Sequence, residues 1–152
     1  MFRPVAEATL EIDAPPARVW EIMLDFSRYP EWNPFVVRVE QPDPIRVGAS
    51  LRLHVRWREG GGASSGERIT ELCPPLGERP GRLAYDFTGL LHDLSFVRAT
   101  RLQQVELLPG DRTRYSTREQ FRGLLTAFLP MAKVRDGFLR HAQALKARAE
   151  AS

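Results

Sequence analysis

Alternation of apolar and polar residues predicts several β-strands along this chain. The clearest run is LRLHVRWR at 51–58, where every second residue from Leu51 to Trp57 is apolar. Such alternation is typical of a strand with one face toward the core and the other toward water. It therefore places His54 on the outer face. Weaker patterns of the same kind predict strands at 5–12, 35–40, 67–72 and 82–88.

The pattern at 67–72 does not determine which side chains of this strand point toward the core. Ile69 and Leu72 can both point inward only if the strand contains a bulge. The stretch before it, 60–66, is rich in glycine and serine. No Gly-Lys-Ser/Thr follows these glycines, so the sequence predicts a hairpin loop and not a phosphate-binding loop.

Two longer alternating runs, 97–107 and 113–121, predict a hairpin around a turn at 109–111. Pairing Leu108 with Arg112 carries the register back along both strands. It places Arg101 opposite Glu119 on the inner face, with Cβ atoms of opposed residues roughly 5 Å apart. A slip of one residue would turn both side chains to the other face. The register thus predicts an Arg–Glu pair on an otherwise largely apolar surface.

Helical periodicity marks the two ends of the chain. An apolar stripe predicts a long core-facing helix from Leu124 to about Ala149. Pro130 lies inside this stripe and should either kink the helix or mark its true start. His141 neighbours the polar side of the stripe and is expected in solvent. Near the N-terminus, the pattern at 19–24 predicts a short helix.

The segment after this first helix carries a recognisable motif. The run DFSRYPEWNP at 25–34, preceded by IDAP at 12–15 and by Val19 and Trp20, resembles the N-terminal signature of the START-like (SRPBCC) superfamily. More narrowly, it is similar to the bacterial polyketide cyclase/dehydrase and lipid-transport branch. The predicted strands and the final helix match the family's layout, so the resemblance covers nearly the whole chain.

This resemblance implies an α+β helix-grip fold for residues 1–152 as a single START-like ligand-binding domain. In that fold a curved antiparallel sheet of about seven strands wraps around the long C-terminal helix, and two short N-terminal helices close one end. The family keeps an apolar cavity between the sheet and the helix.

The predicted inner face has the composition of a ligand site. Large aromatic residues dominate it, yet it also carries polar groups, and a buried charge is costly unless it is paired or solvated. A few polar groups on an apolar concave wall are typical of small-molecule sites. A purely structural Arg101–Glu119 pair, or an error in strand parity, remains the alternative. The candidate ligand-binding residues are Trp32, Phe35, Leu53, Val55, Trp57, Tyr85, Phe87, Arg101, Gln103, Tyr115, Thr117, Glu119, Phe121, Phe128 and Met131.

Three functions fit these residues. The first is binding or carriage of a hydrophobic small molecule such as a lipid, an isoprenoid or an aromatic polyketide. The second is a polyketide cyclase/dehydratase-type enzyme, with Glu119 as base, Arg101 holding an enolate oxygen, and Tyr85 or Tyr115 as acid. The third is a protein-partner-binding domain. No catalytic dyad stands out in the sequence, so we favour a binding protein over an enzyme.

Composition narrows the possible partners. The net charge is +3, but the arginines are scattered and form no basic tract, so no nucleic-acid partner is expected. No apolar run is long enough for an integral membrane segment. The N-terminus has no signal-peptide pattern, and we expect a cytoplasmic protein. The oligomeric state, monomer or homodimer, stays open.

The sequence also predicts neither a metal site nor a cofactor. Cys73 is the single cysteine, which rules out an intramolecular disulfide and a cysteine-based zinc site. The three histidines lie far apart and lack a metal-binding spacing. No nucleotide-binding fingerprint is present.

Overall fold

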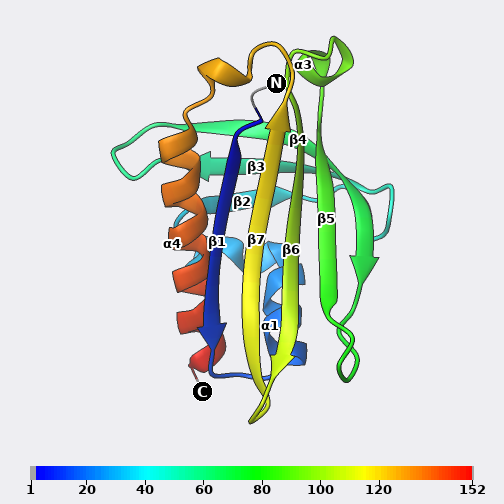
Figure 1. Cartoon of the computed structure of the whole chain (residues 1–152), viewed down its shortest axis with the longest axis vertical. Coiled ribbons are helices and arrows are strands. Elements are labelled where there is room, and N and C mark those ends of the chain that lie inside the picture. Colours follow the sequence, from blue (N-terminus) through cyan, green and yellow to red (C-terminus); the bar gives the residue numbers. More distant parts are fainter. Residues whose placement is uncertain (1–2, 152) are drawn as a thin grey trace.

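The computed structural model describes residues 3–151, which form a curled antiparallel sheet packed on one long helix (Figure 1). The described strands are β1 (Val5–Ile12), β2 (Val36–Glu40), β3 (Ser50–Arg56), β4 (Gly62–Cys73), β5 (Gly81–Thr88), β6 (Arg98–Leu108) and β7 (Arg112–Arg122). The helices are α1 (Pro16–Leu24), α2 (Tyr29–Trp32), α3 (Leu90–Asp93) and α4 (Met131–Glu150), with single 3₁₀ turns at Phe26–Arg28 and Thr126–Phe128. The predicted helix-grip architecture is confirmed.

The sheet runs in the order β1-β7-β6-β5-β4-β3-β2, so the first strand lies beside the last. Figure 1 shows β2 and β3 crossing the direction of β1, β6 and β7, which curls the sheet around α4. The long strand β4 connects these two parts, and its pairing with β5 shifts register between Ile69 and Glu71. This bulge allows both Ile69 and Leu72 to pack toward the core.

The predicted β6–β7 hairpin is confirmed residue by residue. Leu108 pairs with Arg112, and Arg101 pairs with Glu119. The inner face is buried as expected, except that Leu107 near the turn is exposed and Glu119 is half-buried. The register argument therefore placed Arg101 on the concave side of the sheet correctly.

Two element boundaries differ from the sequence prediction. The strand β4 begins at Gly62, so most of the glycine- and serine-rich stretch is strand and the turn lies at 57–61. The helix α4 begins at Met131 with Pro130 at its N-cap. Pro130 thus marks the true start of the helix, and Leu124 to Leu129 form a connection from β7.

The burial of His141 also differs from the prediction. Its side chain is fully buried, because it lies three residues after Phe138 and four before Leu145, in the middle of the core-facing stripe of α4. The sequence prediction counted residues from 124 onward in the apolar stripe, and this shifted the predicted centre of the stripe away from His141. In the helix that begins at Met131, the buried face contains Phe138, Ala142 and Leu145, and His141 belongs to it.

Candidate functional site

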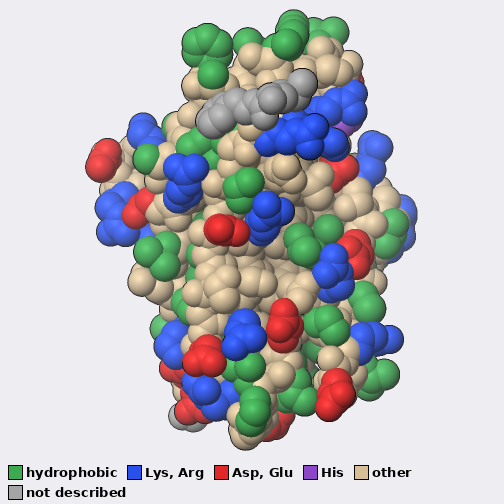
Figure 2. Space-filling view, in the orientation of Figure 1, with side chains coloured by type: hydrophobic (Ala, Val, Ile, Leu, Met, Phe, Trp, Pro, Cys, Tyr) green, Lys and Arg blue, Asp and Glu red, His purple; other side chains and the backbone are tan. Residues whose placement is uncertain are grey.

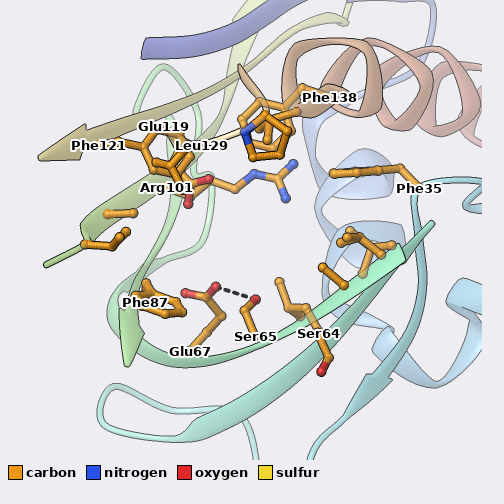
Figure 3. A pocket seen from close by; sticks show the side chains of 18 of the residues that line it. Phe35, Ser64, Ser65, Glu67, Phe87, Arg101, Glu119, Phe121, Leu129 and Phe138 are labelled. Carbon is orange, nitrogen blue, oxygen red and sulfur yellow. Dashed lines mark hydrogen bonds between the residues drawn. The ribbon is translucent and has the colours of Figure 1, made fainter. Parts of the chain in front are cut away.

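A cavity of about 260 Å³ lies between the curled sheet and the first turns of α4 (Figure 3). This volume is slightly below the roughly 300–1,000 Å³ common for small-molecule sites. Its walls are almost entirely apolar and come from β2 to β7, α3 and α4. The lining residues are Phe35, Val36, Leu53, Val55, Trp57, Ala63, Ser64, Ser65, Glu67, Tyr85, Phe87, Leu91, Val97, Ala99, Arg101, Glu119, Phe121, Leu129, Pro130, Val134 and Phe138.

Most of the predicted ligand-binding residues line this cavity. They face the core from strands or strand ends, together with Phe35 after the N-terminal motif. The set is Phe35, Leu53, Val55, Trp57, Tyr85, Phe87, Arg101, Glu119 and Phe121. Their contact with a ligand stays a prediction, but the sequence placed them on the correct wall.

The other predicted residues lie outside the cavity lining. Gln103, Tyr115 and Thr117 face the correct side but are buried further along the sheet, where the ring of His141 stacks on Tyr115 and fills the space. Phe128 is 82% exposed, because it lies in the connection before α4 and not on the helix.

Trp32 and Met131 also lie outside the lining. Both are half-buried against the core. Trp32 packs edge-on against His141 at the N-terminal motif, with ring centroids 5.8 Å apart. The motif therefore contributes Phe35 to the cavity, and Trp32 supports the neighbouring core.

Arg101 is the central polar group of the cavity. Its Nε donates to Thr117 Oγ1 at 2.8 Å and its Nη1 donates to Tyr85 Oη at 3.0 Å. The guanidinium carbon lies 4.2 Å from the centroid of the Phe138 ring. Among the described residues, Nη2 has no hydrogen-bond partner. The Arg101 side chain is thus fixed on three sides, while one edge of the guanidinium stays free.

The predicted Arg101–Glu119 pair is correct as a register and wrong as an ion pair. The two residues are opposite each other on β6 and β7. No ion pair within 4.0 Å joins them, among those found in residues 3–151. Arg101 turns instead to two neutral oxygens and an aromatic face, which leaves its charge without a paired carboxylate.

A chain of neutral groups holds these contacts in place. Gln103 Nε2 donates to Tyr85 Oη at 3.1 Å, and Tyr115 Oη donates to Gln103 Oε1 at 2.6 Å. Burial raises the pKa of both phenols above the usual value. Tyr85 and Tyr115 are therefore neutral at ordinary pH and act as hydrogen-bonding groups around Arg101.

Two carboxyl groups with raised pKa values share the cavity. Burial raises the pKa of Glu67 to about 8, with a further rise from Glu119 against the lowering effects of Ser65 and Arg101. Ser65 Oγ donates to Glu67 Oε1 at 3.0 Å, while Oε2 has no partner among the described residues. Burial also raises the pKa of Glu119 to about 7, opposed by Arg101.

Glu67 is the main functional candidate that sequence reasoning missed. The signal was available, because Glu67 precedes buried Ile69 by two residues and must share its face. The open facing of this strand hid that relation. In the structure the Glu67 carboxyl group and the Arg101 guanidinium point into the same space (Figure 3).

One end of the cavity is surrounded by exposed apolar side chains. Figure 2 shows hydrophobic side chains gathered at the end of the molecule where α3 and the β7–α4 connection lie. Leu91, Leu129 and Pro130 from these segments also line the cavity. The exposed apolar rim consists of Leu90, Leu91, Leu94, Leu124, Leu125 and Phe128.

The N-terminal motif fastens α4 to the cavity wall. Asn33 Oδ1 accepts from the backbone N–H groups of Phe35 and Val36, so its amide nitrogen faces His141 Nδ1 at 3.2 Å. This arrangement assigns the ring proton of His141 to Nε2. Burial lowers the pKa of His141 well below the usual value, with a further lowering by Arg101. The histidine is a neutral structural link between the motif and the helix.

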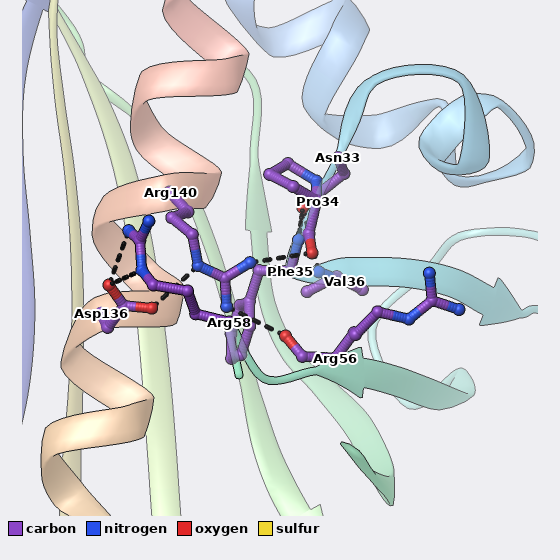
Figure 4. Close-up of polar contacts among 8 residues, drawn as sticks. All are labelled: Asn33, Pro34, Phe35, Val36, Arg56, Arg58, Asp136 and Arg140. Carbon is purple, nitrogen blue, oxygen red and sulfur yellow. Dashed lines mark hydrogen bonds and ion pairs between the residues drawn. The ribbon is translucent and has the colours of Figure 1, made fainter. Parts of the chain in front are cut away.

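A second link comes from Arg140, the residue directly before His141 on α4. Arg140 donates to the carbonyl oxygens of Pro34 and Arg56 and to Asp136, which also binds Arg58 (Figure 4). The two arginines hold the pKa of Asp136 below its usual value. These contacts fasten α4 to the chain before β2 and to the end of β3, close to Phe35.

Comparison with known proteins agrees with this geometry. The sequence matches the family described as polyketide cyclase / dehydrase and lipid transport over residues 3–150. The chain belongs to this family. The predicted membership of the polyketide cyclase/dehydrase and lipid-transport branch is thereby confirmed. We find no match among curated proteins.

Solved structures similar to this member of the polyketide cyclase / dehydrase and lipid transport family share its fold. The Zhui aromatase/cyclase from a Streptomyces species is 21% identical with a TM-score of 0.77, and the match covers 98% of this chain and 94% of that one. A START superfamily protein from Mycobacterium smegmatis is 21% identical with a TM-score of 0.70, covering 96% and 97%. Major latex-like protein 151 from Panax ginseng is 11% identical with a TM-score of 0.74, covering 98% and 99%.

Other classes of site are not found in the described part of the chain. Between residues 3 and 151, no helix combines the length and hydropathy needed to span a bilayer. The same residues contain no cluster of three or more His, Cys, Asp or Glu side chains arranged to hold a metal ion.

Proposed function

We propose that this protein binds and carries an apolar small molecule, such as a lipid, an isoprenoid or an aromatic polyketide, in the cavity between the sheet and α4. The observation that carries the proposal is the 260 Å³ cavity with its almost entirely apolar wall. Burial of apolar ligand surface against such a wall is favourable by roughly 25 cal/mol per Å². The exposed apolar rim supports an opening at that end, since apolar side chains there would ease the transfer of an apolar molecule.

The test is native mass spectrometry of the purified protein, followed by organic extraction of any bound molecule. A ligand released at near one-to-one ratio would support carriage and identify the ligand class. Ala99→Trp should then abolish binding, because Ala99 lines the cavity and the indole would occupy it. Thr100→Trp is the matched control, because Thr100 is the next residue on β6 and its side chain is exposed.

A second candidate is catalysis of the cyclase/dehydratase type. The observation that favours it is the placement of Glu119, with its pKa raised to about 7, beside the cation of Arg101. A group with a pKa near the working pH is well suited to general acid–base catalysis. One solved structure of similar fold is an aromatase/cyclase, which points the same way.

Glu119→Gln separates these two candidates. Turnover of a poly-β-ketone thioester that is lost in this variant while binding is kept would support an enzyme. Binding with no turnover in the unchanged protein would support a carrier. Partner binding, a cytoplasmic location and the lack of a nucleic-acid partner stay predictions of the sequence.

A further inference from the structure

Two deeply buried polar atoms on the cavity wall lack partners among the described residues. They are Nη2 of Arg101, a residue only 2% exposed, and Oε2 of Glu67, a residue only 5% exposed. Buried polar groups are almost always hydrogen-bonded, because each unmade bond is costly. Both residues line the same cavity. Their missing partners therefore point to a polar group that arrives with the ligand.

Arg101 is a cation on this wall that forms no ion pair among the described residues. Arg101 contacts a threonine hydroxyl, a tyrosine hydroxyl and the face of Phe138, all of which are neutral. A guanidinium stays protonated in proteins and has only donors to offer. Its free edge suits an oxygen anion, and low surrounding polarity strengthens such a contact.

We propose that the cavity selects an apolar molecule with a single carboxylate, which accepts hydrogen bonds from Arg101 Nη2 while the protonated carboxyl group of Glu67 donates to it. This inference rests on the proposed ligand-binding function and specifies its ligand class. The apolar remainder of the molecule lies toward Phe87, Phe121 and the rim. The small cavity volume favours a medium-length chain or a compact ring system.

The surrounding titratable groups make this selection depend on pH. They are Glu67 on β4, Tyr85 and Asp86 on β5, Arg101 on β6, Tyr115 and Glu119 on β7, Tyr29 on α2 and His141 on α4. The three tyrosines have raised pKa values and His141 a lowered one, so these groups are neutral.

Only Glu67 and Glu119 change charge inside the cavity near neutral pH, with pKa values of about 8 and about 7. Below both pKa values, Arg101 is the one ionised group among the described residues of the cavity wall. Its positive charge then attracts a carboxylate. Above both values two carboxylates outweigh the guanidinium and repel an anion. Binding should therefore be tight on the acid side and weak on the alkaline side.

The test uses calorimetric titration with octanoate, octanol and octylamine, which share one chain and differ in the head group. We expect octanoate to bind roughly ten- to a hundred-fold more tightly than octanol at pH 6, as for a charge-assisted hydrogen bond. The advantage should largely disappear at pH 9. Octanol should change little between the two conditions.

Three variants locate the effect. Arg101→Gln should remove the preference for octanoate while leaving octanol binding in place. Glu67→Gln should preserve octanoate binding to a higher pH, because a neutral amide replaces the ionising carboxyl group. Arg118→Gln is the matched control: Arg118 on β7 is exposed on the outer face and pairs with Glu7. If Arg101→Gln does not fold, the pH profile of octanoate binding to Glu67→Gln tests the inference alone. A profile identical to that of the unchanged protein would then overturn it.

The possible outcomes distinguish failure of the carboxylate inference from failure of the proposed ligand-binding function. Equal affinity for octanoate and octanol at pH 6 would overturn the carboxylate inference and leave apolar ligand binding intact. Tightest binding of octylamine would also overturn it, since the carboxylates would then be the recognition groups. Binding of none of the three would count against both the inference and the proposed function.

Discussion

Replacement of Glu67 by glutamine should make the ligand-free protein more stable, and the gain should grow with pH. Glutamine has nearly the shape of a protonated glutamate and keeps an acceptor for Ser65. It cannot ionise in the cavity wall. The folded protein holds a proton on Glu67 up to pH about 8, whereas the unfolded chain loses it near the ordinary value of 4.5.

The sign and size follow from this difference in proton binding. Between the two pKa values the folded state binds more protons than the unfolded state, so stability falls as pH rises. One pH unit corresponds to roughly 1.4 kcal/mol. Over pH 5 to 8 the unchanged protein should therefore lose on the order of 3 kcal/mol relative to Glu67→Gln. Below about pH 4.5 the two proteins should converge.

Urea unfolding followed by tryptophan fluorescence at pH 5, 6, 7 and 8 measures this difference. Comparison of the two proteins at each pH cancels the contribution of His141, whose lowered pKa acts in the opposite direction below about pH 6.5. Glu71→Gln is the control on the same strand, because Glu71 forms a surface ion pair with Arg82. Parallel curves for Glu67→Gln and the unchanged protein would refute the buried, protonated state of Glu67.

Three further substitutions test how α4 is fixed over the cavity. Asn33→Ala should cost about 2–4 kcal/mol in urea unfolding, because two backbone N–H groups and His141 each lose a partner; a loss under about 1 kcal/mol would contradict this role. Gly137→Ala should destabilise by about 1–3 kcal/mol despite its better helix propensity, because the new Cβ would overlap the Phe35 ring. Arg140→Ala should destabilise by about 1–3 kcal/mol, whereas Arg135→Ala, which removes one exposed contact, should cost much less.

Strand faces and hairpin register could be predicted from the sequence, because successive side chains of a strand point to opposite faces of the sheet. Leu53 and Trp57 fell on one face by alternation alone, and a short turn fixed Arg101 opposite Glu119. The N-terminal motif supplied the fold, because its two prolines and Asn33 specify one particular chain reversal before β2. These features depend on neighbours that are close in sequence or directly paired.

Other features depended on contacts between distant elements. Phe128 was expected on the helix face, but the true helix start at Met131 leaves it exposed. His141 was expected in solvent, and the same boundary places it in the core. Glu67 required the β4 bulge to be located before its facing could be known. A single uncertain boundary or bulge changed the predicted environment of each of these residues.

The environment of Arg101 shows why register alone did not determine the chemistry of the site. A direct ion pair with Glu119 would have neutralised the guanidinium and left an ordinary structural contact. Instead Phe138 of α4 covers one face of the guanidinium, while Tyr85 and Thr117 take its hydrogen bonds. Phe138 is in position because the N-terminal motif and Arg140 hold α4 to the chain before β2 and to the end of β3. The charge presented to the cavity therefore depends on helix docking, and a substitution at Asn33 should weaken carboxylate selection without altering a residue of the cavity wall.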